Sequence, residues 1–195
     1  LARADSLYLL LLLAGAFVLR GSPDRPGRAA LAGALWCLAF LTKQSAPFVV
    51  APLAILLLLR RERPALFAPL VAALLSAAAF LVLNATSGGW FRFYVFDVAT
   101  AHRPELALAL RFPGRFLFRL APALVAFGVV AFAARERLAK GALAFHAFWF
   151  AGLLLSSWHL ASYRGGYDNV ALTVCLGAAL LGGIASSASA QGGPA

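Results

Sequence analysis

The stretch LAFLTKQSAPFVV, residues 38–50, is apolar at both ends and carries Thr42, Lys43 and Gln44 in its middle. A lysine between two hydrophobic runs lies either in the tight turn between two membrane spans or at membrane depth. Charges at membrane depth are costly, so those that occur there usually have a function. The stretch therefore predicts the end of one apolar helix and the start of another, with Lys43 as the residue to explain.

The same apolar character extends over the whole chain. Of its 195 residues, 63% are hydrophobic and 12% are charged, whereas soluble domains have about 45–50% apolar and about 25% charged residues. The excess lies in long runs of Leu, Ala, Val and Phe, which are typical of membrane-spanning helices. The composition excludes an ordinary soluble domain and predicts an all-α, polytopic integral membrane protein.

Breaks at charges, prolines and glycines divide the chain into about seven expected transmembrane helices. They cover residues 6–20, 28–41, 46–59, 64–83, 113–134, 142–161 and 170–184. We assign residues 1–185 to a single transmembrane helical domain and residues 186–195 to a flexible polar tail. Because the sequence has no methionine and no signal-peptide pattern at its start, we expect it to be a C-terminal fragment whose first helices lie upstream.

The loops between the expected helices are of two kinds. Short, Arg-rich loops at 20–28, 60–64 and 135–140 fit the cytoplasmic side under the positive-inside rule. Loops with mixed polar, acidic and aromatic residues, at 42–44, 84–112 and 162–169, then lie outside, and chemistry is expected there. The longest of them, 84–112, predicts an extracytoplasmic interfacial helix or re-entrant turn, because it is rich in the aromatic residues that settle at headgroup level.

The formal charge of +10 does not predict a nucleic-acid partner. The chain has no basic low-complexity tail and no recognition motif. Arginines at the ends of membrane helices orient the protein and contact anionic lipid headgroups. Membrane lipids are therefore the expected partners of these cations.

Three stretches together resemble a family of known fold. They are RADSLYLLLLLAGAFVLR (3–20), ALAGALWCLAFLTKQSAPFVVAPLAILLLLRR (30–61) and GGWFRFYVFDVATAHRPE (88–105). The chain resembles the bacterial GT-C fold glycosyltransferases that use polyprenyl-phosphate donors, which include protein mannosyltransferases and lipid A aminoarabinose transferases. The resemblance implies inverting transfer of a sugar from the carrier to a glycan, lipid or protein of the cell envelope, on the outer face of the cytoplasmic membrane.

The resemblance also implies roles for individual residues. Asp5 matches an acidic position beside the family's active site and is the expected catalytic residue in this chain, where it orients hydroxyls or helps to hold a divalent cation. Lys43 matches the family's lysine near the carrier phosphate, with Gln44 as its neighbour. YRGGYDNV (163–170) is similar to a late family motif, which makes Arg164 and Tyr167 candidate substrate-binding residues.

The family's main catalytic base lies in an earlier loop that has no counterpart in this sequence. General-base catalysis needs a carboxylate within hydrogen-bond reach of the proton that it removes. We therefore expect these 195 residues alone to bind polyprenyl phosphate but to transfer no sugar.

Each of these residues also has a structural interpretation. The Lys43 side chain can simply extend from a helix end so that its ammonium reaches the headgroups, and Asp5 fits the cap of the first helix. Arg111, Arg115 and Arg119 are spaced four residues apart, which predicts one stripe along the start of the fifth expected helix. That stripe either faces headgroups or guides the carrier phosphate as a substrate-binding track.

Two other classes of function stay open at this point. In a transporter or channel, Lys43 and the short helices would line a permeation path, and a non-catalytic membrane scaffold would need no site at all. The sequence shows no internal repeat. Asp97, His102 and Glu105 are not expected to form a metal site, because their spacing matches no established set of ligands.

The two kinds of loop predict the topology of the chain. In a cysteine-free background, Arg63→Cys and Arg137→Cys should react with a membrane-impermeant reagent only after the cytoplasmic side is opened. Ser87→Cys should react in intact cells, because residue 87 lies in the long outer segment. Labelling of both arginine positions from outside would invert the orientation.

Overall fold

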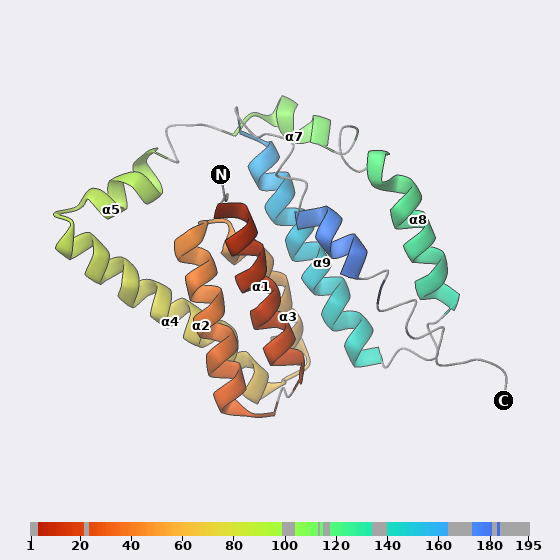
Figure 1. Cartoon of the computed structure of the whole chain (residues 1–195), viewed down its shortest axis with the longest axis horizontal. Helices are drawn as coiled ribbons and strands as arrows, with labels where there is room; N and C mark the ends of the chain where they lie inside the picture. Colours follow the sequence, from red (N-terminus) through yellow and green to blue (C-terminus); the bar gives the residue numbers. More distant parts are fainter. Residues whose placement is uncertain are drawn as a thin grey trace. The chain divides into compact units, whose positions relative to one another are not determined.

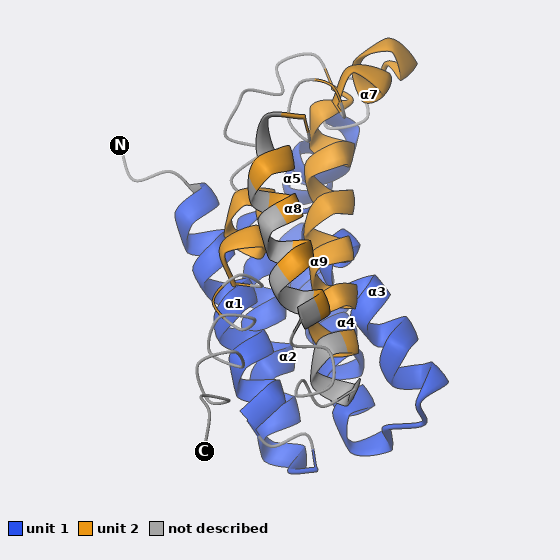
Figure 2. Ribbon diagram, turned by 90° about the vertical axis from the view of Figure 1, so that its right-hand side faces the viewer, with its two compact units in different colours: residues 1–103 blue, residues 104–195 orange. Residues whose placement is uncertain are grey.

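The computed structural model describes residues 4–21, 24–98, 104–112, 114, 118–133, 140–163, 173–180 and 183. Most of these residues lie in helices, and no strand occurs among them (Figure 1). The all-α part of the expected fold is thus confirmed. The chain divides into two compact units, residues 1–103 and 104–195 (Figure 2).

Unit 1 contains four long helices and a short helical segment. They are α1 (Ala4–Gly21), α2 (Pro26–Thr42), α3 (Ala46–Leu59), α4 (Arg63–Thr86), α5 (Trp90–Arg92) and the π-helical turn η1 (Phe93–Asp97). The four long helices match the first four expected helices to within a few residues at each end. α2, α3 and α4 each have a proline in the first turn, where its missing N–H leaves no hydrogen bond unmade.

The turn between α2 and α3 is where Lys43 lies. Lys43 has extended backbone angles, φ −155° and ψ 123°, and its N–H donates to the Ala39 carbonyl at 2.8 Å, so it ends α2. Ser45 precedes the first residue of α3, and Pro47 lies in that helix's first turn. Lys43 is therefore a turn residue between two apolar helices, the first of the two interpretations that its sequence context allowed.

Helix α2 packs most extensively on α4 and on α1. Its buried face carries small residues, among them Ala29, Ala32 and Gly33. A Cβ atom on Gly33 would lie 2.5 Å from the Ala68 carbonyl oxygen of α4, so the two helices approach to backbone contact there. On the α1 side, the Trp36 indole N–H donates to the Leu12 carbonyl at 3.3 Å.

Unit 2 contains α7 (Leu106–Phe112), α8 (Phe118–Ala133), α9 (Lys140–Ala161) and a further helical stretch at 173–180. Buried Phe112 and Val174 pack with Phe150 and Leu154 of α9. Two hydrogen bonds hold α7 to the end of α9: Trp158 Nε1 donates to the Ala109 carbonyl at 3.0 Å, and Glu105 N donates to the Ser162 carbonyl at 2.8 Å. Small side chains thus bring α2 close to α4 in unit 1, whereas larger apolar side chains and two hydrogen bonds to backbone carbonyls make the contacts of unit 2.

Within the described residues, one helix is long and apolar enough to cross a membrane. This helix is α4, which has 24 residues and a mean hydropathy of 2.5 over an 18-residue stretch, while α2 and α3 are shorter apolar helices. Leucines of α4 such as Leu74 and Leu81 are more than half exposed. The seven expected spans stay a prediction.

The close α2–α4 contact predicts a sharp difference between two glycines of the same helix. Gly33→Ala should lower the free energy of unfolding by about 1–3 kcal/mol, because the new methyl group forces the helices apart. Gly27→Ala is the matched control: nothing lies within 4 Å of its added Cβ, and the better helix propensity should leave stability unchanged or raise it by up to about 1 kcal/mol. Circular dichroism during denaturation in mixed micelles measures both. Equal stability of the two variants would contradict the close contact.

Candidate functional site

Asp5 and Lys43, two residues singled out from the sequence, form an ion pair. The Lys43 Nζ donates to the Asp5 Oδ1, and the side chains are 22% and 17% exposed respectively. The pair joins the first turn of α1 to the turn that follows α2, across 38 residues of sequence. The structure therefore brings together the expected catalytic carboxylate and the expected phosphate-binding cation.

The helix ends favour the charges that they carry. Asp5 lies in the first turn of α1, where exposed N–H groups make the end of the helix partly positive. Lys43 follows the last turn of α2, where exposed carbonyl groups make the end partly negative. Because α1 and α2 pack side by side with these two ends together, the helix dipoles and the ion pair stabilise the same arrangement.

Two further side chains complete this cluster, and both are buried. Tyr8, one turn after Asp5 on α1, is 1% exposed, and its hydroxyl oxygen accepts a hydrogen bond from Ser45 Oγ at 3.1 Å. The Lys43 Nζ lies 5.7 Å from the centroid of the Tyr8 ring, within the range of a cation–π interaction. We call Asp5, Tyr8, Lys43 and Ser45 the Asp5–Lys43 cluster.

Tyr8 and Ser45 were missed from the sequence. The one sequence feature that links them to the candidate site is their spacing. Tyr8 follows Asp5 by three residues, which puts both on one face of a helix, and Ser45 is two residues from Lys43. A tyrosine in a leucine run has too many structural explanations for that spacing alone to identify it.

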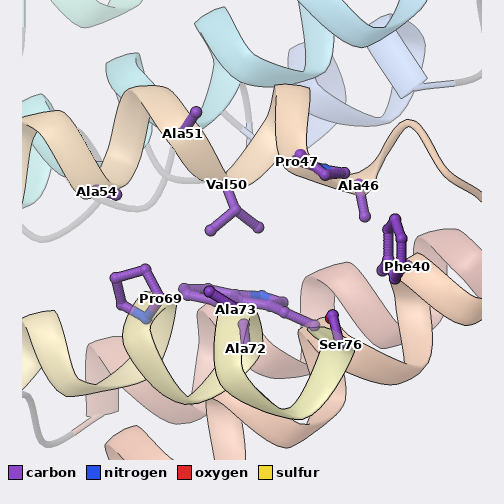
Figure 3. Close-up of a pocket in the computed structure, with 11 residues that line it drawn as sticks. Phe40, Ala46, Pro47, Val50, Ala51, Ala54, Pro69, Ala72, Ala73 and Ser76 are labelled. Atoms are coloured by element: carbon purple, nitrogen blue, oxygen red, sulfur yellow. The ribbon is translucent and has the colours of Figure 1, made fainter. Parts of the chain in front are cut away.

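An apolar cleft of about 370 Å³ lies between α2, α3 and α4 (Figure 3). Figure 3 shows Val50 of α3 facing Pro69 and Ala73 of α4 across it. The remaining lining residues are Trp36, Phe40, Ala46, Pro47, Ala51, Ala54, Ala72 and Ser76. Phe40 and Ala46 flank Lys43 in the chain, so this end of the cleft adjoins the turn that carries the cluster.

The site residues expected in addition to Asp5 and Lys43 are Gln44, Arg111, Arg115, Arg164 and Tyr167. Gln44 is exposed beside Lys43, and Arg111 is exposed on α7 of unit 2. Arg115, Arg164 and Tyr167 lie outside the described residues. No group of three His, Cys, Asp or Glu side chains that could hold a metal ion occurs in the described part of the chain.

The expected arginine stripe stays a prediction. Arg111 lies in the last turn of α7 and Arg119 in the first turn of α8, while Arg115 lies outside the described residues.

The sheltered ion pair predicts a measurable coupling. Asp5→Asn and Lys43→Gln should each lower the free energy of unfolding by about 1–3 kcal/mol, because each leaves a mostly buried charge without its counter-ion. The double variant should lose less than the sum of the two by at least about 0.5 kcal/mol. Denaturation of all four proteins in mixed micelles gives this double-mutant cycle.

The pair Arg60–Glu62 is the control for that cycle. Its closest charged atoms are 3.8 Å apart and its side chains are 33% and 40% exposed, so its coupling should be below about 0.5 kcal/mol. Additive effects of the Asp5 and Lys43 substitutions would mean that the pair contributes no more than this exposed one.

No family model, no curated protein and no solved structure matches this chain. The chemistry and geometry of its own side chains therefore have to indicate the function.

Proposed function

We propose that this chain belongs to a polytopic membrane glycosyltransferase that moves a sugar from a polyprenyl-phosphate carrier to an envelope acceptor. In this proposal the Asp5–Lys43 cluster faces the outer side of a bacterial cytoplasmic membrane, and the Arg-rich loops face the cytoplasm. The observation that carries the proposal is the sheltered ion pair of Asp5 and Lys43 beside an apolar cleft. That combination suits a ligand with an anionic head and a hydrocarbon tail.

Lys43 is the group that binds the carrier phosphate. When the bond between sugar and phosphate breaks, negative charge builds up on the phosphate oxygen that leaves. An ammonium group held in position in a sheltered site stabilises that charge. The ammonium has three N–H donors, and its bond to Asp5 uses one of them, so Lys43 has the capacity to donate to Asp5 and to phosphate together.

Asp5 has two roles in the proposal. Its carboxylate holds the Lys43 ammonium in one place through the ion pair. It also accepts hydrogen bonds from hydroxyl groups of the sugar or the acceptor, which is the polar chemistry that a carboxylate supplies in a sugar site. Before a ligand binds, the ion pair of Asp5 and Lys43 is neutral overall. Burying it therefore costs less free energy than burying either charge alone.

The cleft between α2, α3 and α4 receives part of the isoprenoid chain. Its lining is made of alanines, prolines, aromatic rings and one valine, with Ser76 as the one hydroxyl side chain among them. Ligand sites of this volume class are usually apolar with a few polar groups that fix orientation. Gln44 stays a candidate neighbour of the phosphate, and Arg111, Arg115, Arg164 and Tyr167 stay candidate substrate-binding residues from the sequence.

Lys43 variants test this function. In the intact enzyme in membranes, Lys43→Ala should reduce turnover by about 30-fold to 1,000-fold, equivalent to about 2–4 kcal/mol of lost transition-state stabilisation. Lys43→Arg should retain part of the activity, because it keeps a cation at the same position. The measurement is transfer of radiolabelled sugar from a panel of polyprenyl-phosphate donors to envelope extract, at equal amounts of folded protein.

Carrier binding gives a second readout from the same variants. The purified chain in lipid nanodiscs should bind polyprenyl phosphate more tightly than polyprenol, and Lys43→Ala should abolish that difference while Arg60→Ala, which removes an exposed arginine in the turn after α3, leaves it unchanged. Normal turnover by Lys43→Ala, together with equal binding of polyprenol and polyprenyl phosphate by the unsubstituted chain, would show that Lys43 has only a structural role.

A further inference from the structure

The chain makes a sharp, hydrogen-bonded elbow after α4. Gly88 and Gly89 have positive φ angles of 61° and 91°, which glycine adopts without the strain that a side chain would cause. Two side chains of the elbow bind the backbone of the next segment: Asn84 Oδ1 accepts from Arg92 N at 3.0 Å, and Ser87 Oγ accepts from Phe91 N at 2.9 Å. These bonds fix the direction in which α5 and η1 leave α4.

The inner face of this segment packs back on α4. The Phe80 ring of α4 lies 5.8 Å from the Phe91 ring and 5.4 Å from the Phe96 ring, between ring centroids. Val95 is buried on the same segment. The segment is therefore held by aromatic contacts as well as by the elbow, and its orientation relative to α4 is set within unit 1.

The outer face is also aromatic, and it is uncovered in this structure. Trp90, Phe93 and Tyr94 are 59%, 43% and 65% exposed. Their rings contact one another: Trp90 stacks on Tyr94 with centroids 5.8 Å apart, and Trp90 meets Phe93 edge-on at 5.5 Å. A segment that is aromatic on both faces has little surface suited to bulk water, apart from the exposed charged residues Arg92 and Asp97.

Two features of α4 indicate what covers the outer face. Leu81 and Val82, in the last turns of this membrane-length helix, are 66% and 60% exposed, so an apolar surface suited to acyl chains continues to the elbow. At the elbow the sequence changes to Asn84, Thr86 and Ser87, which marks the level where hydrocarbon ends. Trp and Tyr concentrate at that level of a bilayer, and an exposed arginine complements anionic headgroups.

We propose that Trp90, Phe93 and Tyr94 form an aromatic anchor that binds the phospholipid interface and fixes the depth of α4. The three rings lie at the boundary between lipid headgroups and acyl chains, and Arg92 lies toward the lipid phosphates. The anchor rests on the membrane placement in the proposed function, but it does not require any catalytic role of the Asp5–Lys43 cluster.

The depth of Trp90 in the bilayer tests the anchor. The full chain and its Trp90→Phe variant are reconstituted in liposomes whose lipids carry bromine at a chosen depth, and the difference in fluorescence between the two proteins isolates Trp90 from the other three tryptophans. We expect the strongest quenching from lipids brominated closest to the headgroups. Strongest quenching by bromine at the chain ends, or no quenching at any depth, overturns the anchor.

Alkaline extraction of the same liposomes distinguishes a failure of the anchor from a failure of the membrane placement in the proposed function. A chain that is extracted into the soluble fraction contradicts both, because it does not span the bilayer. A chain that stays in the bilayer while Trp90 is not quenched contradicts the anchor alone, and it would show that the aromatic face is covered by protein.

The elbow supplies a second test with a matched control. Replacing Asn84 and Ser87 together by alanine removes the two side-chain acceptors, so the depth of Trp90 should shift or its quenching should spread over several depths. Thr86→Ala is the control, because the Thr86 hydroxyl donates only within α4, to the Val82 and Leu83 carbonyls. An unchanged depth profile in the double alanine variant would mean that the elbow does not position the anchor.

Discussion

Glycine and alanine on α2 allow its backbone to lie against α4 and α1, and the remaining geometry of unit 1 follows from this contact. In the membrane placement proposed above, there is little hydrophobic driving force between helices, so their association relies on close packing and hydrogen bonds. Gly33 supplies the closest approach to α4, and Trp36 supplies a hydrogen bond to the backbone of α1. With α1 and α2 fixed side by side, the start of one helix and the end of the other meet, and Asp5 and Lys43 are brought into contact.

The contrast between the Asp5–Lys43 cluster and its surroundings is what makes it a candidate site. The pair carries two formal charges in a part of the unit that is otherwise built from leucine, alanine and aromatic side chains. A purely structural turn between two apolar helices needs neither charge, since glycine, serine or asparagine would serve. Tyr8 and Ser45 add a buried hydroxyl pair beneath the ion pair, so each polar group of the cluster has a defined position before a ligand arrives.

Much of the fold could be predicted from the sequence, because apolar runs ended by arginine, proline and glycine define helices directly. The bounds of α1 to α4 differ from the expected ones by a few residues, and the aromatic segment after α4 is helical, as expected. Helix α7 was not foreseen, because it lies in the stretch 84–112 that was expected to be a loop with an interfacial helix or re-entrant turn. For the candidate site, Asp5 and Lys43 were proposed from the sequence and stay candidates. Their mutual contact, and the contacts of Tyr8 and Ser45, depend on which helix faces pack together. The hydrophobic pattern does not encode this where every face is apolar.

The ion pair also has a consequence for biogenesis. In the proposed orientation, the turn that carries Lys43 and the start of α1 must both cross the bilayer while the protein is being inserted. Moving a lysine or an aspartate alone past the centre of the membrane costs about 2.5–3.5 kcal/mol on insertion scales. If α1 and α2 enter as a hairpin with Asp5 and Lys43 already in contact, the two charges cross as a neutral pair. The same contact that shapes the mature site would then lower the barrier to translocating its outer end.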